Sequence, residues 1–188
     1  MNDKRKIRLI GLGSTGDKLV KIFADYQYKT PTVEINSINI KQDTINYLKM
    51  TTKNDNFTTD SQENSITQNA DIDKNLIKEI NYIMQTSKKI IFVIDGCCEN
   101  DINGLFELIR LAKSYYVIYE VIIISPCQKQ KDTIYEDFFE IAKIKLKRQR
   151  VQYKTIELEA DYTWNVVPKR RLNQDLLMEA FVYSVQTF

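Results

Sequence analysis

Apolar runs of strand length alternate along this chain with segments whose apolar residues repeat at helical spacing. Five segments have strand character: residues 7–12, 32–40, 88–96, 115–126 and 153–159. The run at 88–96 (KKIIFVIDG) is almost continuously apolar and ends at Asp95-Gly96, which is typical of a strand buried on both faces of a parallel sheet. We therefore expect this strand in the middle of a sheet.

Between the strand segments, apolar residues recur at positions i, i+3, i+4 and i+7, the spacing of one helix face. The stripe over residues 72–84 is the cleanest, and Asp73 suits the start of that helix because a carboxylate can cap its free N–H groups. A second helix is expected to open at Asn103-Gly104. Another, after the fourth strand, is expected to bury Ile141 on its apolar face.

This alternation predicts an α/β protein with a three-layer, Rossmann-like fold, in which a mostly parallel sheet carries helices on both faces. The length of 188 residues fits a single domain over residues 1–188. Residues 51–69 contain mainly Thr, Asn, Asp, Ser and Gln. Such a segment buries too little apolar surface to offset its ordering entropy, so a mobile polar loop is expected there.

Composition and charge narrow the class of function. With a net charge of +2, the sequence gives no reason to expect a nucleic-acid partner. It contains no run of 18 apolar residues, so membrane insertion is not expected. The first residues show no signal peptide, and three cysteines make a poor disulfide framework, so a cytoplasmic protein is expected. The chain has no histidine, which excludes histidine-based catalysis.

The sequence GLGSTG at residues 11–16 follows a strand and opens a helix. In that context a glycine-rich turn brings backbone N–H groups and a positive helix end to a phosphate. A dinucleotide-binding motif also needs an acidic residue at the end of the second strand. Here the strand ends in NIKQ at 39–42, and the first acidic residue, Asp43, lies beyond its end. NAD is therefore disfavoured. Phosphate binding and a purely structural use of the glycines both stay open.

The chain carries, in order, the segments IRLIGLGSTGDKLVKIF, VEINSINIKQDTI, KKIIFVIDG with INGLFELIRLAK, YEVIIISP and LLMEAF. Their order and spacing resemble the GTPase domain of FtsZ, the bacterial relative of tubulin, over nearly the whole chain. The resemblance implies a nucleotide site formed by the first loop, an Asn after the second strand, a signature loop after the central strand and a Pro after the fourth. The residues that it places at this site are Gly11, Gly13, Ser14, Thr15, Gly16, Asn39, Gly96, Gly104 and Pro126.

The departures from this family concern charge. Where FtsZ-like proteins carry a run of Gly and Thr, this chain reads GCCENDING, with Glu99 and Asp101 close to where phosphates would lie. Asp17 stands beside the first loop, at a position where the family has Gly. Two like unit charges about 4 Å apart repel by roughly 4 kcal/mol at an effective dielectric constant near 20. Loss of GTP turnover is therefore expected.

Two functions follow from these observations. In the first, the chain is a divergent FtsZ-like pseudo-GTPase with no catalytic residue, metal or required cofactor, which acts by binding itself or another FtsZ-like protein. In the second, it is a switch or hydrolase that still binds GTP, GDP or another nucleotide through the loop at residues 11–16. The first is preferred because of the carboxylates, and if the chain is an enzyme, it is a GTPase.

Two charged clusters have alternative interpretations. Asp95, Glu99 and Asp101 could hold Mg²⁺ or Ca²⁺, although acids in a loop more often form a solvated turn. The basic run at residues 143–150 could meet an acidic partner or RNA, although a solvated helix face is the preferred interpretation.

Overall fold

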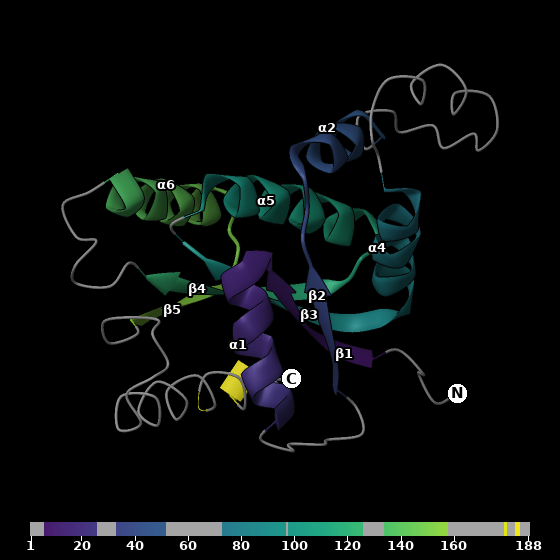
Figure 1. The fold of residues 1–188 in the computed structure, drawn as a ribbon, viewed down its shortest axis with the longest axis horizontal. Coiled ribbons are helices and arrows are strands. Elements are labelled where there is room, and N and C mark those ends of the chain that lie inside the picture. The colour runs from purple at the N-terminus through teal and green to yellow at the C-terminus, as the bar shows by residue number, and fades with distance from the viewer. Residues whose placement is uncertain are drawn as a thin grey trace.

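The described part of the chain forms a five-stranded parallel sheet (Figure 1). The computed structural model describes residues 6–25, 33–51, 73–96, 98–125, 134–157, 179 and 183–184. The strands are β1 (Lys6–Leu12), β2 (Val33–Ile38), β3 (Ser87–Asp95), β4 (Ile118–Ser125) and β5 (Tyr153–Glu157). Their order is β2-β1-β3-β4-β5, so β3 lies in the centre as its apolar run predicts.

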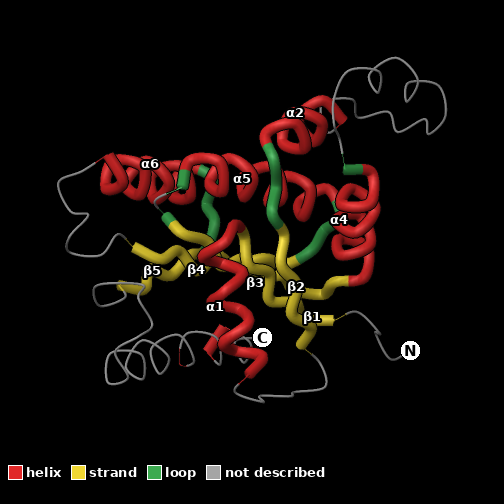
Figure 2. The backbone as a smooth tube through the Cα atoms, in the orientation of Figure 1, coloured by secondary structure: helices red, strands yellow, loops and turns green. Residues whose placement is uncertain are grey.

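Helices cover both faces of this sheet, which gives three layers (Figure 2). The helices are α1 (Gly13–Asp25), α2 (Gln42–Thr51), α4 (Lys74–Thr86), α5 (Glu99–Ser114) and α6 (Ile134–Arg148). Helix α1 packs on one face, whereas α4, α5 and α6 pack on the other and α2 lies against α5. The predicted Rossmann-like α/β fold is therefore confirmed.

The core has two parts because β3 is buried on both sides. Phe92 belongs to the larger cluster, which the sheet forms with α2, α4, α5 and α6. Ile91 belongs to the smaller cluster, which includes Leu9 from β1 and Leu19 from α1. Residues 90–94 are all 0% exposed. Burial of these two faces is the main favourable term that holds the layers together.

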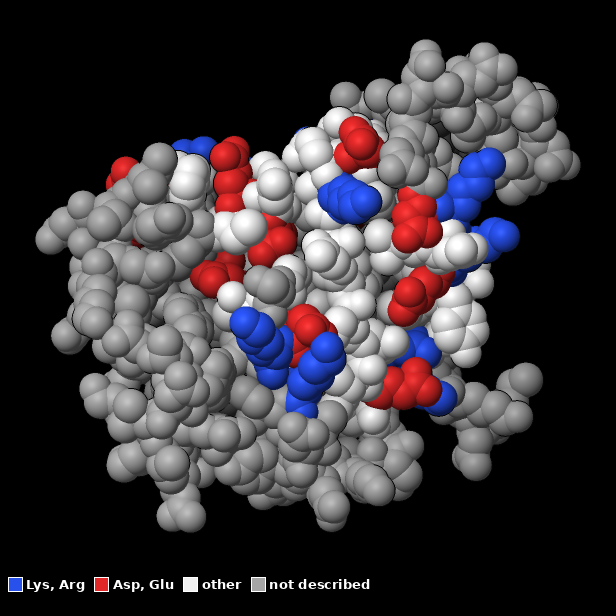
Figure 3. Space-filling model, viewed as in Figure 1, with Lys and Arg blue, Asp and Glu red and all other residues white. Residues whose placement is uncertain are grey.

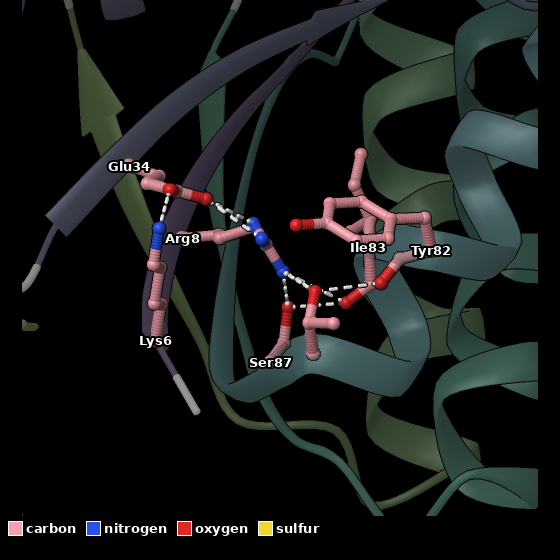
Figure 4. A network of polar contacts seen from close by, with 7 residues as sticks. Lys6, Arg8, Glu34, Tyr82, Ile83 and Ser87 are labelled. Carbon is pink, nitrogen blue, oxygen red and sulfur yellow. Dashed lines mark hydrogen bonds and ion pairs between the residues drawn. The ribbon is translucent and has the colours of Figure 1, made fainter. Parts of the chain in front are cut away.

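Arg8 of β1 is 1% exposed and joins four elements at the amino ends of the strands (Figure 4). Its Nη2 donates to Oε2 of Glu34 in β2 at 2.7 Å, and its Nη1 donates to Thr86 Oγ1 at 2.7 Å and Ser87 Oγ at 2.8 Å. Hydrogen bonds from Lys6 and then from Arg8 lower the pKa of Glu34. A buried guanidinium is tolerated here because its donors are satisfied.

A second buried network fixes Ser184 beside β3, β4 and β5. Glu120 Oε2 lies 3.2 Å from Nζ of Lys89, and its Oε1 lies 3.2 Å from Nζ of Lys154. The Ser184 hydroxyl donates to Glu120 at 3.0 Å, while Lys89 donates to the Ser184 carbonyl at 2.6 Å. Ser184 is 0% exposed. This residue near the end of the chain is therefore part of the layer on the α1 face.

Several local predictions are confirmed and others are wrong. Asp73 caps α4, where its carboxylate accepts from the N–H groups of Asn75 and Leu76. Helix α5 begins at Glu99 rather than at Asn103-Gly104, because the segment after β3 already has helical geometry.

Two further details of the helices differ from the prediction. Ile141 is 46% exposed, because α6 turns Phe139, Ala142 and Leu146 to the core instead. Helix α2 is not among the predicted helices, because its short sequence carries only a few core residues.

Some predictions lie outside the described residues. The mobile loop expected over 51–69 is one of them, except that Thr51 ends α2. Pro126 is another, and so is the segment LLMEAF apart from Glu179.

Candidate functional site

The glycine-rich sequence at residues 11–16 joins the carboxyl end of β1 to the first turn of α1. Gly11 is the penultimate residue of β1, and Gly13 is the first residue of α1. Gly13 has φ of +67°, in the left-handed region that favours glycine. Ser14, Thr15 and Gly16 follow in the first turn of the helix. The predicted strand, turn and helix are therefore present.

Gly11 and Gly16 let α1 pack closely on the sheet. A Cβ on Gly16 would lie 2.5 Å from the Val93 carbonyl oxygen in β3 and 3.1 Å from the carbonyl carbon of Gly11. A Cβ on Gly11 would lie 2.7 Å from the backbone nitrogen of Asp17. These neighbours are backbone atoms, which cannot move aside cheaply. Packing alone therefore explains both glycines.

Gly13 is different, because the atoms against it belong to a side chain. A Cβ on Gly13 would lie 2.7 Å from Oδ1 of Asp101 and closer still to Oδ2. Asp101 comes from the first turn of α5, which follows β3. Its carboxylate therefore lies directly against the first residue of α1. A helix N-terminus with its free N–H groups favours an anion, and here a carboxyl group of the same chain lies at that end of α1.

The surroundings of Asp101 disfavour its charge. Burial raises the pKa of Asp101, a hydrogen bond with Cys98 lowers it in part, and the negative charge of Asp95 raises it further. Burial likewise raises the pKa of the Cys98 thiol. Desolvation penalises the charged form of each group. The carboxyl end of β3 is therefore acidic and partly shielded from solvent, which makes it poorly suited to binding several phosphate charges.

Asp17 was expected to repel phosphate, but its carboxylate forms an ion pair and a hydrogen bond with neighbouring side chains. Lys21 lies 2.7 Å from Oδ2, and the Ser37 hydroxyl of β2 donates to Oδ1. The bond from Lys21 and then that from Ser37 lower the pKa of Asp17. Figure 3 shows basic side chains over α1 with an acidic one between them. Because Asp17 is paired with Lys21, Asp101 is the acid that we expect to repel a phosphate most strongly.

The other predicted site residues have local roles that need no ligand. The Gly96 N–H donates to the Ile124 carbonyl at 3.0 Å, and a Cβ there would lie 2.5 Å from Cδ2 of Phe139. Gly104 lies inside α5, where a Cβ would come within 3.4 Å of Cδ1 of Ile40. Most of the expected signature loop between the two glycines is thus helix.

Asn39 follows the end of β2 and is exposed. Since β2 and β1 are parallel neighbours, it shares the carboxyl edge of the sheet with residues 11–13. Nucleotide binding by these residues stays a prediction. Glu99, which was expected near the phosphates, is an exposed residue at the start of α5.

Sequence reasoning missed Ser37 and Cys98 as partners of the two acids. Ser37 reaches Asp17 because β2 pairs with β1 in a register that sets Ser37 opposite Gly11. That register depends on long-range pairing and leaves no signal in the sequence. Cys98 precedes Asp101 by three residues, a spacing that brings them together once α5 begins at Glu99.

Metal and membrane features were searched over the same residues. Within the described ranges, no group of three or more Cys, Asp or Glu side chains is arranged to hold a metal ion. None of the described helices is both long and apolar enough to cross a membrane.

The strand order β2-β1-β3-β4-β5 with helices on both faces is a doubly wound α/β arrangement, and comparison with solved structures shows that this chain has the FtsZ/tubulin-like fold. Among solved structures, the chain is similar to an empty FtsZ dimer from M. jannaschii, with a TM-score of 0.58 and 11% sequence identity. The match covers 93% of this chain and 52% of that one, so the chain spans about half the length of the FtsZ subunit. No protein-family model and no curated protein matches the sequence.

Proposed function

We propose that the chain is a divergent FtsZ-like pseudo-GTPase that acts in the cytoplasm as a non-catalytic interaction or regulatory protein. Its partner would be a second copy or another FtsZ-like protein. The proposal depends on one observation, the Asp101 carboxylate against Gly13 at the start of α1. The similar FtsZ structure is a dimer, which supports self-association as a candidate.

The energies of the two electrostatic effects at this site favour loss of nucleotide binding over its retention. A helix N-terminus stabilises an anion by about 0.3–1 kcal/mol at an exposed site. A carboxylate about 4 Å from one phosphate charge opposes it by roughly 4 kcal/mol at an effective dielectric constant of 20. A nucleotide triphosphate carries several such charges. The repulsion from Asp101 therefore outweighs the attraction of the retained turn.

A titration with fluorescent GTP, with and without Mg²⁺, tests this proposal. Wild type should bind weakly, and Asp101→Asn should gain about tenfold or more in affinity because one like charge is removed. Glu99→Gln is the matched control, because it removes an exposed charge from the same helical turn and should change affinity less. Tight binding by wild type, or release of phosphate from GTP, would overturn the proposal.

A nucleotide-binding switch is the second candidate, and two observations favour it. Gly13 keeps a left-handed backbone conformation at the start of α1, and Asp17 is already bound to Lys21 and Ser37. In this alternative, GTP or GDP binds through Gly11, Gly13, Ser14, Thr15, Gly16 and Asn39, with Gly96 and Gly104 at the ends of the second loop. This alternative requires the Asp101 side chain to turn away from Gly13 or to lose its charge. Tight binding of GTP by wild type in the same titration would support it.

A further inference from the structure

The outer face of α6 carries a short apolar stripe that no other described element covers. Phe139, Ala142 and Leu146 turn to the core and are at most 6% exposed. Ile141 and Ile144 point away from that face and are 46% and 47% exposed. Positions three or four apart on a helix are neighbours, so these two isoleucines form one patch on its surface.

Basic side chains surround the second half of this stripe. Lys145 and Arg148 continue the spacing that begins at Ile141 and Ile144, and both are exposed. No acidic residue occurs between positions 141 and 156. Within the described residues, neither Lys145 nor Arg148 forms an ion pair, whereas Lys143 is paired with Glu140 one turn earlier. The Lys145 ammonium lies 5.7 Å from the centroid of the Phe106 ring in α5, a contact that leaves its charge without a carboxylate partner among the described residues.

Cations near a helix C-terminus interact favourably with its dipole, which accounts for the lysines and the arginine. It does not account for two half-exposed, β-branched apolar side chains among them. Such residues gain from burial, and a surface of apolar anchors ringed by charge is typical of protein interfaces.

We propose that the stripe formed by Ile141, Ile144, Lys145 and Arg148 is a docking surface for an acidic amphipathic helix of a partner protein. The isoleucines would receive the apolar face of that helix, and Lys145 and Arg148 would pair with its carboxylates. Asp137 lies one turn before Ile141 and is exposed, so the stripe is acidic at its start and basic at its end. The partner's acids should therefore lie beside the last two turns of α6.

The composition of the stripe favours a protein over the other anionic partners. RNA is recognised largely by stacking on aromatic or guanidinium planes, and this stripe offers one such plane, that of Arg148, beside two isoleucines and no aromatic ring. A lipid surface would have to be held by two half-exposed isoleucines, which offer little area for insertion. An apolar helix face, in contrast, matches two isoleucines one turn apart.

This inference rests on the proposed function in one respect, since it names a class of partner for an interaction protein. Its test does not involve nucleotide. Tight binding in the GTP titration would contradict the pseudo-GTPase proposal, whereas the docking surface is tested by peptide binding alone. Failure of one proposal can therefore be distinguished from failure of the other.

The probe is a synthetic, fluorescein-labelled peptide with leucines on one helix face and glutamates on the other, titrated with the full chain and followed by anisotropy. Lys145→Glu with Arg148→Glu should weaken binding about tenfold or more, since two attractions become repulsions. Lys74→Glu with Lys78→Glu is the matched control, because it makes the same change of charge on exposed positions of α4. It should leave binding within about twofold.

The apolar half of the stripe is tested separately. Ile141→Ser with Ile144→Ser should weaken binding about tenfold. Ile118→Ser removes an isoleucine that is 55% exposed on β4 and should leave binding unchanged. All these positions are exposed, so circular dichroism and thermal unfolding should show a native fold for each variant.

Results of three kinds would overturn the inference. One is absence of peptide binding, or equal loss in the stripe and control variants. Another is tighter binding to a single-stranded RNA oligonucleotide, which would assign the basic run to nucleic acid. The third is tighter binding to phosphatidylserine vesicles, which would assign it to a lipid surface.

Discussion

The contact between Gly13 and Asp101 can be measured by a double-mutant cycle. Gly13→Ala introduces a Cβ at a residue with φ of +67°, where an L-residue costs about 1–2 kcal/mol. The new Cβ would also lie 2.7 Å from Oδ1 of Asp101 and nearer to Oδ2, so the carboxylate has to move. Because Asp101 is only partly buried, that movement should cost about 1 kcal/mol, the low end for overpacking. The total loss of stability should therefore be about 2–3 kcal/mol.

The cycle separates these two costs. In an Asp101→Ala background the carboxylate is gone, so Gly13→Ala should cost only the backbone strain of about 1–2 kcal/mol. The difference between the two backgrounds, about 1 kcal/mol, is the coupling energy. It is obtained from urea unfolding of wild type, the two single variants and the double variant. A coupling below the roughly 0.3–0.5 kcal/mol error of additivity would show that Asp101 does not lie against Gly13.

Gly16→Ala provides the contrast. Its Cβ would lie 2.5 Å from the Val93 carbonyl oxygen, which belongs to the backbone of the central strand. Asp101→Ala should therefore give no rescue of Gly16→Ala. Rescue of both glycine variants by Asp101→Ala would indicate a general effect on stability and would remove the support for the pseudo-GTPase proposal.

Three further predictions concern stability. Glu120→Gln should cost about 3–5 kcal/mol in urea unfolding, because it leaves the ammonium groups of Lys89 and Lys154 without the carboxylate between them; an unchanged midpoint would contradict this network. Tyr116→Gly should stabilise the chain by about 0.5–1 kcal/mol, because Tyr116 has φ of +56° and is 91% exposed; a loss of stability would point to a contact made by its ring. The raised pKa of Asp101 means that its ionised form costs folding free energy above that pKa and nothing below the ordinary value of 3.8. Asp101→Asn should therefore be more stable than wild type at pH 7, with a gain that disappears as the pH falls below 3.8; a gain independent of pH would refute the charge argument.

The fold could be predicted from the sequence because its signals are local and strong. A continuous apolar run such as 90–94 has few alternatives to a central strand, and helical spacing on either side of it restricts the topology. The boundary of α5 was missed for a local reason as well. Glycine and asparagine at 103–104 suggested a helix start, but the helix carries them in its interior, where Gly104 permits the approach of Ile40.

The site was less predictable because it depends on which side chains meet across strands. Sequence alone placed Glu99 and Asp101 equally near the phosphates, yet only Asp101 reaches Gly13. Once α5 begins at Glu99, the helical turn sets Asp101 on the side of α1. Ile141 shows the same limit, because a shift of one position in the buried face of α6 exposes it.

The glycine-rich turn itself is weak evidence for a nucleotide in this chain, because its glycines have different causes. Gly11 and Gly16 are required wherever α1 packs this closely on β1 and β3, whether or not a ligand binds. Gly13 is required by its backbone conformation, and the group that uses the space beside it is a carboxylate of the same chain. A substitution at Gly11 or Gly16 would weaken folding and any nucleotide binding together, so it could not tell the two causes apart. Asp101 is the position where they separate, since its replacement keeps the packing and changes only the charge that meets an anion.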